Sequence, residues 1–126
     1  MKALITPDVT SARRGARPRP APLSTEQLAL VAEHLKALSE PARLQILSTL
    51  TAGPRTVNEI VQITRMHQAN VSKHLQILYA HGIVMRRRDR QFVQYALTDQ
   101  RVFALCELVC ASIEEAAEAR KELIGV

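Results

Sequence analysis

The chain has 126 residues, a length that suits one compact domain and is too short for two. Its 17 lysines and arginines against 12 acidic residues give a formal net charge of +5, and 47% of its residues are hydrophobic, as in a folded protein. No apolar run reaches the roughly 18 residues of a membrane span, and residues 1–23 lack the apolar stretch of a secretory signal. We therefore expect a cytoplasmic protein with no membrane partner.

The positive charge is concentrated in two segments. Residues 1–23 contain five basic residues and one acidic residue, and residues 54–100 contain seven and three. Such clustering is typical of a surface that meets nucleic-acid phosphates. Because residues 1–23 are rich in proline and lack apolar periodicity, they are predicted to form a flexible basic arm, which precedes a folded domain over residues 24–126.

Two helices are predicted at the start of the folded domain. Ser24 and Gln27 form a capping-box pattern for a helix over Thr25–Leu38. A second helix is expected to begin near Pro41, since proline suits a first helical turn, and to end before the Gly53-Pro54 pair.

The next segment has the pattern of a helix-turn-helix. Thr56 and Glu59 form another capping box, which opens a short helix. After a tight turn, a further helix is predicted over Gln68–Ala80, with Gly82 as its left-handed end. Two short helices joined in this way are typical of helix-turn-helix units.

A hairpin and a long helix complete the chain. The segments Ile83–Arg88 and Phe92–Leu97 have strand character and flank a polar turn, so they are expected to pair. From Asp99 as a cap, one long helix should run toward the end of the chain. The predicted fold is mainly α with a small β-hairpin, a winged helix-turn-helix.

These residues resemble the ArsR/SmtB (arsenic-repressor) family of bacterial winged-helix repressors over roughly residues 24–110. The resemblance lies in Leu38–Leu47, in Gln68–Leu75, and in the wing segments Gly82–Val84, Arg86–Arg88 and Val93–Tyr95. It implies a homodimer formed by the first and last helices, double-stranded operator DNA as the partner of the fourth helix, and release when an effector binds. Residues 24–126 would then be a winged-helix DNA-binding and dimerisation domain.

The fourth helix carries candidate DNA-reading residues at its N-terminal turns, where short side chains reach base edges. Gln68 and Asn70 suit adenine, and Ala69 suits a thymine methyl group. Ser72, Lys73 and His74 suit phosphates or neighbouring bases. The alternative is an ordinary solvated helix face. His67 stands where the family usually has a serine cap, and imidazole caps less well.

The hairpin carries four candidate phosphate-binding arginines, namely Arg86, Arg87, Arg88 and Arg90. In a winged helix this tip lies along the backbone or minor groove, where arginine gains from the negative potential. Alternatively, the charges protect an edge strand from aggregation, a role that is compatible with DNA binding.

Cys106 and Cys110 are the candidate effector site, because residues four apart on a helix face the same way. Two thiolates at this spacing suit a soft ion such as As(III), Sb(III), Cd(II), Hg(II) or Zn(II), with a further ligand from the partner protomer, from His34 or from a small thiol. Oxidation or persulfidation of the thiols, and simple packing of a helix seam, are the alternatives. No cofactor is required.

Comparison with the ArsR/SmtB family narrows the possible locations of the effector site. Members that sense through the third helix carry a cysteine pair near its start, where this chain has Thr56 and Asn58. Members with a metal site on the final helix use Asp and His, and no His follows His81 here. The cysteines on the last helix are therefore the remaining place for a metal or a thiol-reactive compound.

Three functions follow from the sequence, and none is enzymatic, since there is no glycine-rich phosphate loop and no base near either cysteine. The first is a dimeric repressor released from its operator by a soft metal or metalloid. The second is a repressor that senses redox state or reactive sulfur through the same cysteines. The third is a winged-helix module that binds another protein through its basic surface.

Overall fold

The structure of the protein is a computed structural model that describes residues 21–125. The predicted basic arm, residues 1–23, lies almost wholly outside this range. The described part contains these elements in chain order: α1 (Thr25–Leu38), α2 (Pro41–Thr49), β1 (Arg55–Thr56), α3 (Val57–Thr64), α4 (Gln68–Ala80), β2 (Val84–Asp89), β3 (Phe92–Leu97) and α5 (Arg101–Ile124). The mainly α, winged helix-turn-helix fold expected from the sequence is confirmed.

Local hydrogen bonds fix the helix starts, as the capping boxes predicted. The backbone N–H of Ser24 donates to Gln27 Oε1 over 2.9 Å, and the N–H of Gln27 donates to Ser24 Oγ over 3.1 Å. The N–H of Thr56 donates to Glu59 Oε1 over 2.8 Å, and the reciprocal bond is 3.2 Å long. Each box satisfies two N–H groups that a helix N-terminus leaves without partners.

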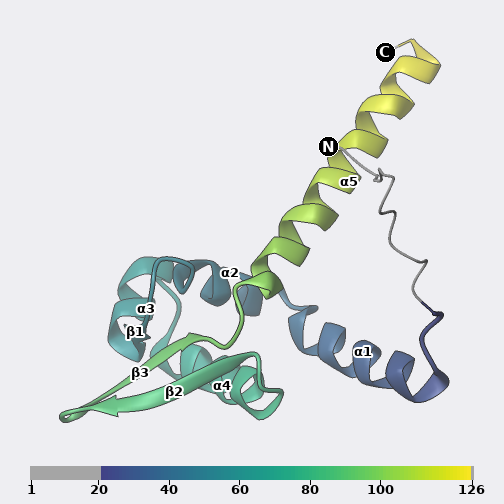
Figure 1. Cartoon of the computed structure of the whole chain (residues 1–126). Helices are drawn as coiled ribbons and strands as arrows, with labels where there is room; N and C mark the ends of the chain where they lie inside the picture. Colours follow the sequence, from purple (N-terminus) through teal and green to yellow (C-terminus); the bar gives the residue numbers. More distant parts are fainter. Residues whose placement is uncertain (1–20, 126) are drawn as a thin grey trace, which may run out of the picture. The chain divides into compact units, whose positions relative to one another are not determined.

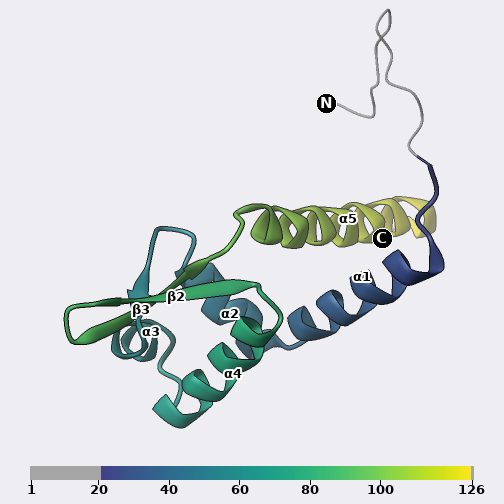
Figure 2. The same ribbon diagram turned by 60° about the horizontal axis from the view of Figure 1, so that its bottom comes forward.

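The chain divides into two compact units within α1, between Leu30 and Val31. In the second unit α2, α3 and α4 gather beside the β2–β3 hairpin, and the turn of the hairpin extends away from them (Figures 1 and 2). Their apolar sides share one core. Its fully buried side chains are Ile46, Leu47, Leu50, Ile60, Val71, Leu75, Leu78 and Val84.

The sheet has one more strand than the sequence predicted. Its antiparallel order is β1-β3-β2, in which the two-residue β1 pairs with β3 at Tyr95 and Gln94. A strand this short carries no alternation of polar and apolar residues, so no sequence pattern reveals it. On the other side of β3 the hairpin register sets Arg86 opposite Tyr95 and Arg88 opposite Val93.

The long helix α5 begins at Arg101, and its N-cap is Gln100 rather than the predicted Asp99. The Asp99 carboxylate accepts hydrogen bonds from the Arg101 backbone N–H over 2.9 Å and from its guanidinium over 2.7 Å. The Arg101 side chain thereby lowers the pKa of Asp99 to about 2. None of the α5 side chains is buried.

The core packing predicts the effect of a cavity in α2. Leu47→Ala should lower the free energy of unfolding by about 2–5 kcal/mol, because Leu47 has no exposed surface and its neighbours fill in only partly. Urea unfolding at a fixed protein concentration measures this loss. Gln45→Ala on the exposed side of the same helix is the matched control and should change stability by no more than about 0.5 kcal/mol. Equal losses in the two variants would contradict the assigned core.

Candidate nucleic-acid interface

The first turn of α4 presents polar side chains to solvent. Gln68, Ala69 and Asn70 are exposed, whereas Val71 is fully buried and anchors the helix from the opposite side. The N-cap residue His67 has extended backbone angles and makes no side-chain capping bond. The first N–H groups of α4 therefore keep their capacity to donate to an anion, and the helix dipole favours negative charge there.

Further along α4, the remaining candidate residues separate into two groups. Lys73 is exposed and Ser72 is half-buried, so both remain accessible for contact with phosphates. His74 is also half-buried, and its Nδ1 atom lies 3.3 Å from Nη1 of Arg43 on α2. Burial, followed by the charges of Arg43 and Lys73, lowers the pKa of His74 below its ordinary value of 6.5, while Glu40 opposes the shift. One edge of the His74 ring thus faces the protein.

The four arginines of the wing are all exposed, but they differ in their contacts and in their positions on the hairpin. The guanidinium carbon of Arg86 lies 4.1 Å from the centre of the Tyr79 ring, a cation–π contact that joins β2 to α4. Hydrogen bonding to Tyr95, opposite it on β3, raises the pKa of Arg86. Arg87 points to the other face of the hairpin, since neighbouring residues of a strand alternate. Arg90 forms the turn in the left-handed conformation, with φ of 62°.

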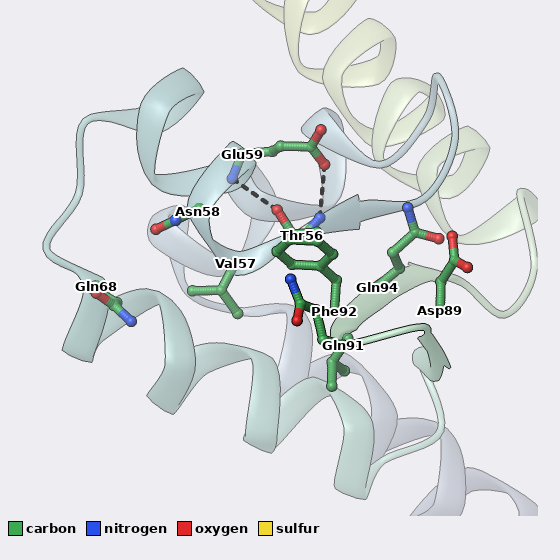
Figure 3. A pocket seen from close by; sticks show the side chains of 10 residues that line it. Thr56, Val57, Asn58, Glu59, Gln68, Asp89, Gln91, Phe92 and Gln94 are labelled. Atoms are coloured by element: carbon green, nitrogen blue, oxygen red, sulfur yellow. Dashed lines mark hydrogen bonds between the residues drawn. The ribbon is translucent and has the colours of Figure 1, made fainter.

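A hollow of about 530 Å³ lies between the start of α3 and the wing. Figure 3 shows Gln91, Phe92 and Gln94 of the wing facing Thr56 and its neighbours at the start of α3. Amides from several elements line the hollow. They are Asn58, Gln68, Gln91 and Gln94.

No DNA-binding role was predicted from the sequence for Asn58, Gln91, Phe92 or Gln94. The amides beside the wing turn were the available signal, because amide side chains both donate to phosphates and pair with base edges. Glu59 also lines the hollow, but its carboxylate is engaged in the capping box shown by the dashed lines of Figure 3.

The two cysteines of α5 lie in different surroundings, and both are free thiols. Cys110 is exposed, whereas Cys106 is half-buried and its thiol donates to the Val102 carbonyl oxygen over 3.5 Å. Burial raises the pKa of Cys106, and the nearby Glu107 carboxylate acts in the same direction. Cys106 is therefore a protonated thiol at neutral pH and must lose its proton to bind a metal.

The described residues around the cysteines do not complete a metal site within one chain. Among residues 21–125, no three histidine, cysteine or acidic side chains come together in an arrangement that could hold a metal ion. His34 lines a hollow of about 510 Å³ together with Val102 and Leu105, at the start of α5. His34 is thus brought to the same helix as the cysteines but not into a ligand set with them.

A helix-turn-helix with an exposed polar recognition helix and an arginine-rich hairpin defines a winged-helix DNA-binding protein. Residues 40–86 match the model of the family described as bacterial regulatory protein, arsR family. Of the helices in the described range, none has the length and apolar character needed to cross a membrane.

Individual relatives cover more of the chain. It is 38% identical to the HTH-type transcriptional regulator NmtR of Mycobacterium tuberculosis over 92 residues, which are 72% of this chain and 77% of the relative. It is 37% identical to a probable mercury resistance operon repressor of Streptomyces lividans over 87 residues, 68% of this chain and 70% of the relative. The solution structure of the homodimeric winged helix-turn-helix DNA-binding domain of Mb0332 from Mycobacterium bovis superposes with a TM-score of 0.65 at 34% identity, covering 77% of this chain and 95% of that one.

The chain therefore belongs to the arsR family of bacterial regulatory proteins. As the fold and the relatives agree, it is a DNA-binding transcriptional regulator and not an enzyme.

The uncapped start of α4 gives a stability prediction. His67→Ser should raise the free energy of unfolding by roughly 1 kcal/mol, because a serine hydroxyl accepts a first-turn N–H bond that the imidazole leaves unmade. Urea denaturation of the two proteins checks this. As a control, Gln100→Ser at the N-cap of α5 should gain less, because the Asp99 carboxylate already accepts the Arg101 N–H there. A destabilised His67→Ser variant would mean that the imidazole has a role other than capping.

Proposed function

We propose that the protein is a homodimeric transcriptional repressor that binds operator DNA through α4 and the wing. A thiol-reactive effector that binds Cys106 and Cys110 of α5 then releases it. The observation that carries the proposal is the exposed polar N-terminal turn of α4 beside a wing with four exposed arginines. The relatives named as transcriptional regulators and repressors support it.

In this proposal α4 enters the major groove with its first turn toward the base edges. Gln68 and Asn70 pair with bases, and Ala69 contacts a thymine methyl group. Lys73 and the wing arginines Arg87, Arg88 and Arg90 neutralise phosphates, so affinity falls steeply with salt. Arg86 contributes mainly by holding the wing against Tyr79.

Dimerisation through α1 and α5 is supported by their exposed apolar side chains. Val31 and Leu35 of α1 are each 42% exposed. On α5, Leu108 is 70% and Ile113 is 64% exposed, and a 24-residue helix with no buried side chain lacks the packing that stabilises helices in proteins. A second copy of the chain would supply that packing, and the similar winged-helix domain from Mycobacterium bovis is described as homodimeric.

The effector class follows from the chemistry of two thiols. Thiolates prefer soft ions, and the relative named a probable mercury resistance operon repressor points in the same direction. Since no third ligand joins the two thiols within residues 21–125, the partner protomer or a small thiol completes the site. Oxidation or persulfidation of the same two cysteines, of which Cys110 is the exposed one, is the alternative.

The base-reading role of Gln68 gives the first functional prediction. Gln68→Ala should weaken binding to the operator by about 1–3 kcal/mol and leave binding to unrelated duplex DNA almost unchanged. Fluorescence anisotropy on both DNAs measures this. The matched control is Gln76→Ala, an exposed glutamine two turns further along α4, which should have little effect on either DNA. Equal losses on both DNAs would refute base reading by Gln68. A wild-type protein without any preference for the operator would instead favour a module that binds another protein.

The proposed effector site gives the second functional prediction. Cys106→Ser and Cys110→Ser should each leave operator affinity intact and abolish release, because one thiolate cannot chelate a soft ion. The measurement is anisotropy on DNA upstream of the protein's own gene, titrated with As(III), Cd(II), Zn(II) and a polysulfide. Ala111→Ser, which alters the same helix and keeps both thiols, should be released like wild type. Release by polysulfide alone, with the matching mass increase, would establish the sulfur-sensing alternative. A Cys106→Ser variant still released by the same effector would remove the cysteines from the mechanism.

A further inference from the structure

Arg43 of α2 contacts two other helices at once. Its Nε atom donates to the carbonyl oxygen of Ala37 at the end of α1, and its Nη1 atom lies 3.3 Å from Nδ1 of His74 on α4. The side chain is half-buried. One planar group therefore lies between the end of α1 and the recognition helix.

The first contact satisfies the last carbonyl group that would otherwise lack a donor at the C-terminus of α1. The last four carbonyl groups of a helix have no partners within it. The backbone and hydroxyl of Ser39 take two of these carbonyls, and the backbone of Glu40 takes a third. The remaining one belongs to Ala37, which is only 3% exposed, so water cannot readily replace Arg43 as the donor.

The second contact determines the chemical state of His74. A guanidinium has hydrogen-bond donors and no acceptor, so Nδ1 of His74 must be the acceptor and the ring proton must sit on Nε2. The other charged groups that influence the ring are Lys73 on the same helix and Glu40 before α2. Burial, Arg43 and Lys73 together outweigh Glu40, so the pKa of His74 is lowered and the neutral imidazole is favoured.

We propose that Arg43 is a positioning residue that fixes the tautomer and ring orientation of His74, so that α4 presents a neutral Nε2–H donor to DNA in a register set by the end of α1. The proposal rests on the proposed binding of DNA by α4. It adds a connection between the helix that we assign to the dimer and the helix that we assign to base reading.

Arginine is needed at this position for a geometric reason. The Nε and Nη1 atoms belong to one rigid fork and reach two acceptors on different helices. A lysine at position 43 keeps the charge but offers one nitrogen, which can serve the Ala37 carbonyl or His74 but not both in the same geometry. Arg43→Lys therefore removes the forked geometry and keeps the positive charge, whereas Arg43→Gln removes both.

Arg55 provides a matched control. Its Nε atom donates to the Thr49 carbonyl oxygen at the end of α2 over 2.7 Å, across the same separation of six residues. In the structure its side chain makes no hydrogen bond to a histidine of the described range. Arg55→Lys thus perturbs the same kind of helix end without touching His74.

The experiment is nitrogen-detected NMR of the histidine rings in the full-length protein, with His74 assigned from a His74→Gln variant. We expect the Nε2–H tautomer in the wild type and a pKa below 6.5, an unchanged His74 in Arg55→Lys, and mixed tautomers in Arg43→Lys. In Arg43→Gln the pKa of His74 should rise. Operator affinity should fall about tenfold in both Arg43 variants, the size of one lost hydrogen bond, and stay at the wild-type level in Arg55→Lys.

The pH profile separates positioning from general stability. As the pH falls from 8 to 6, the His74 ring should gain its proton at a higher pH in Arg43→Gln than in the wild type. Operator affinity of Arg43→Gln should therefore rise relative to wild type toward pH 6, and the added substitution His74→Gln should abolish this difference.

An Nδ1–H tautomer in the wild type, or an unchanged His74 ring in Arg43→Lys, would overturn the proposal. So would equal losses of operator affinity in Arg43→Lys and Arg55→Lys. If the wild type has no operator preference while the ring results hold, the failure belongs to the proposed function and not to the contact between Arg43 and His74.

Discussion

The burial of one side of α4 determines what its other side can do. Val71, Leu75 and Leu78 are all fully buried, which fixes the rotation of the helix about its axis against α2 and α3. Because the three residues are spaced as one helical stripe, the first-turn residues Gln68 and Asn70 are left exposed. The exposed polar turn is thus a consequence of core packing, and a change in the core would rotate it.

The wing is attached to α4 by a contact that involves one of its arginines but not the others. Cross-strand pairing sets Arg86 opposite the buried Tyr95, on the side where Tyr79 of α4 lies under its guanidinium. The next arginine points away from that side because strand residues alternate. One charge of the cluster therefore holds the hairpin to the recognition helix, and the others extend beyond the contact.

Much of this architecture is local and could be predicted from the sequence. Ser24 with Gln27 and Thr56 with Glu59 identified two helix starts, because a capping box depends on residues three apart. The N-cap of α5 was displaced by one residue, since Asp99 pairs with the Arg101 guanidinium as well as with its backbone. The two-residue β1 was missed because its pairing with β3 is set by the fold and not by its own pattern.

The contact between Arg43 and His74 joins residues 31 positions apart, and no spacing rule connects them. The sequence assigned His74 to DNA from its place on the recognition helix, whereas the structure shows that one ring edge is occupied by the protein. The amides of the hollow between α3 and the wing are a similar case, because they come together only when the hairpin folds toward α3.

The packing of α5 limits how an effector bound to this helix can reach the DNA-binding surface. Val102 is the α5 side chain that packs against the core of the described chain, and it lies one turn before Cys106. The rest of the helix has exposed apolar side chains, and none of its side chains is buried in the described part of the chain. A ligand at the cysteines therefore acts mainly on the surface that we assign to the partner protomer. If α1 shares that surface, Arg43 is the side chain that joins the end of α1 at Ala37 to His74.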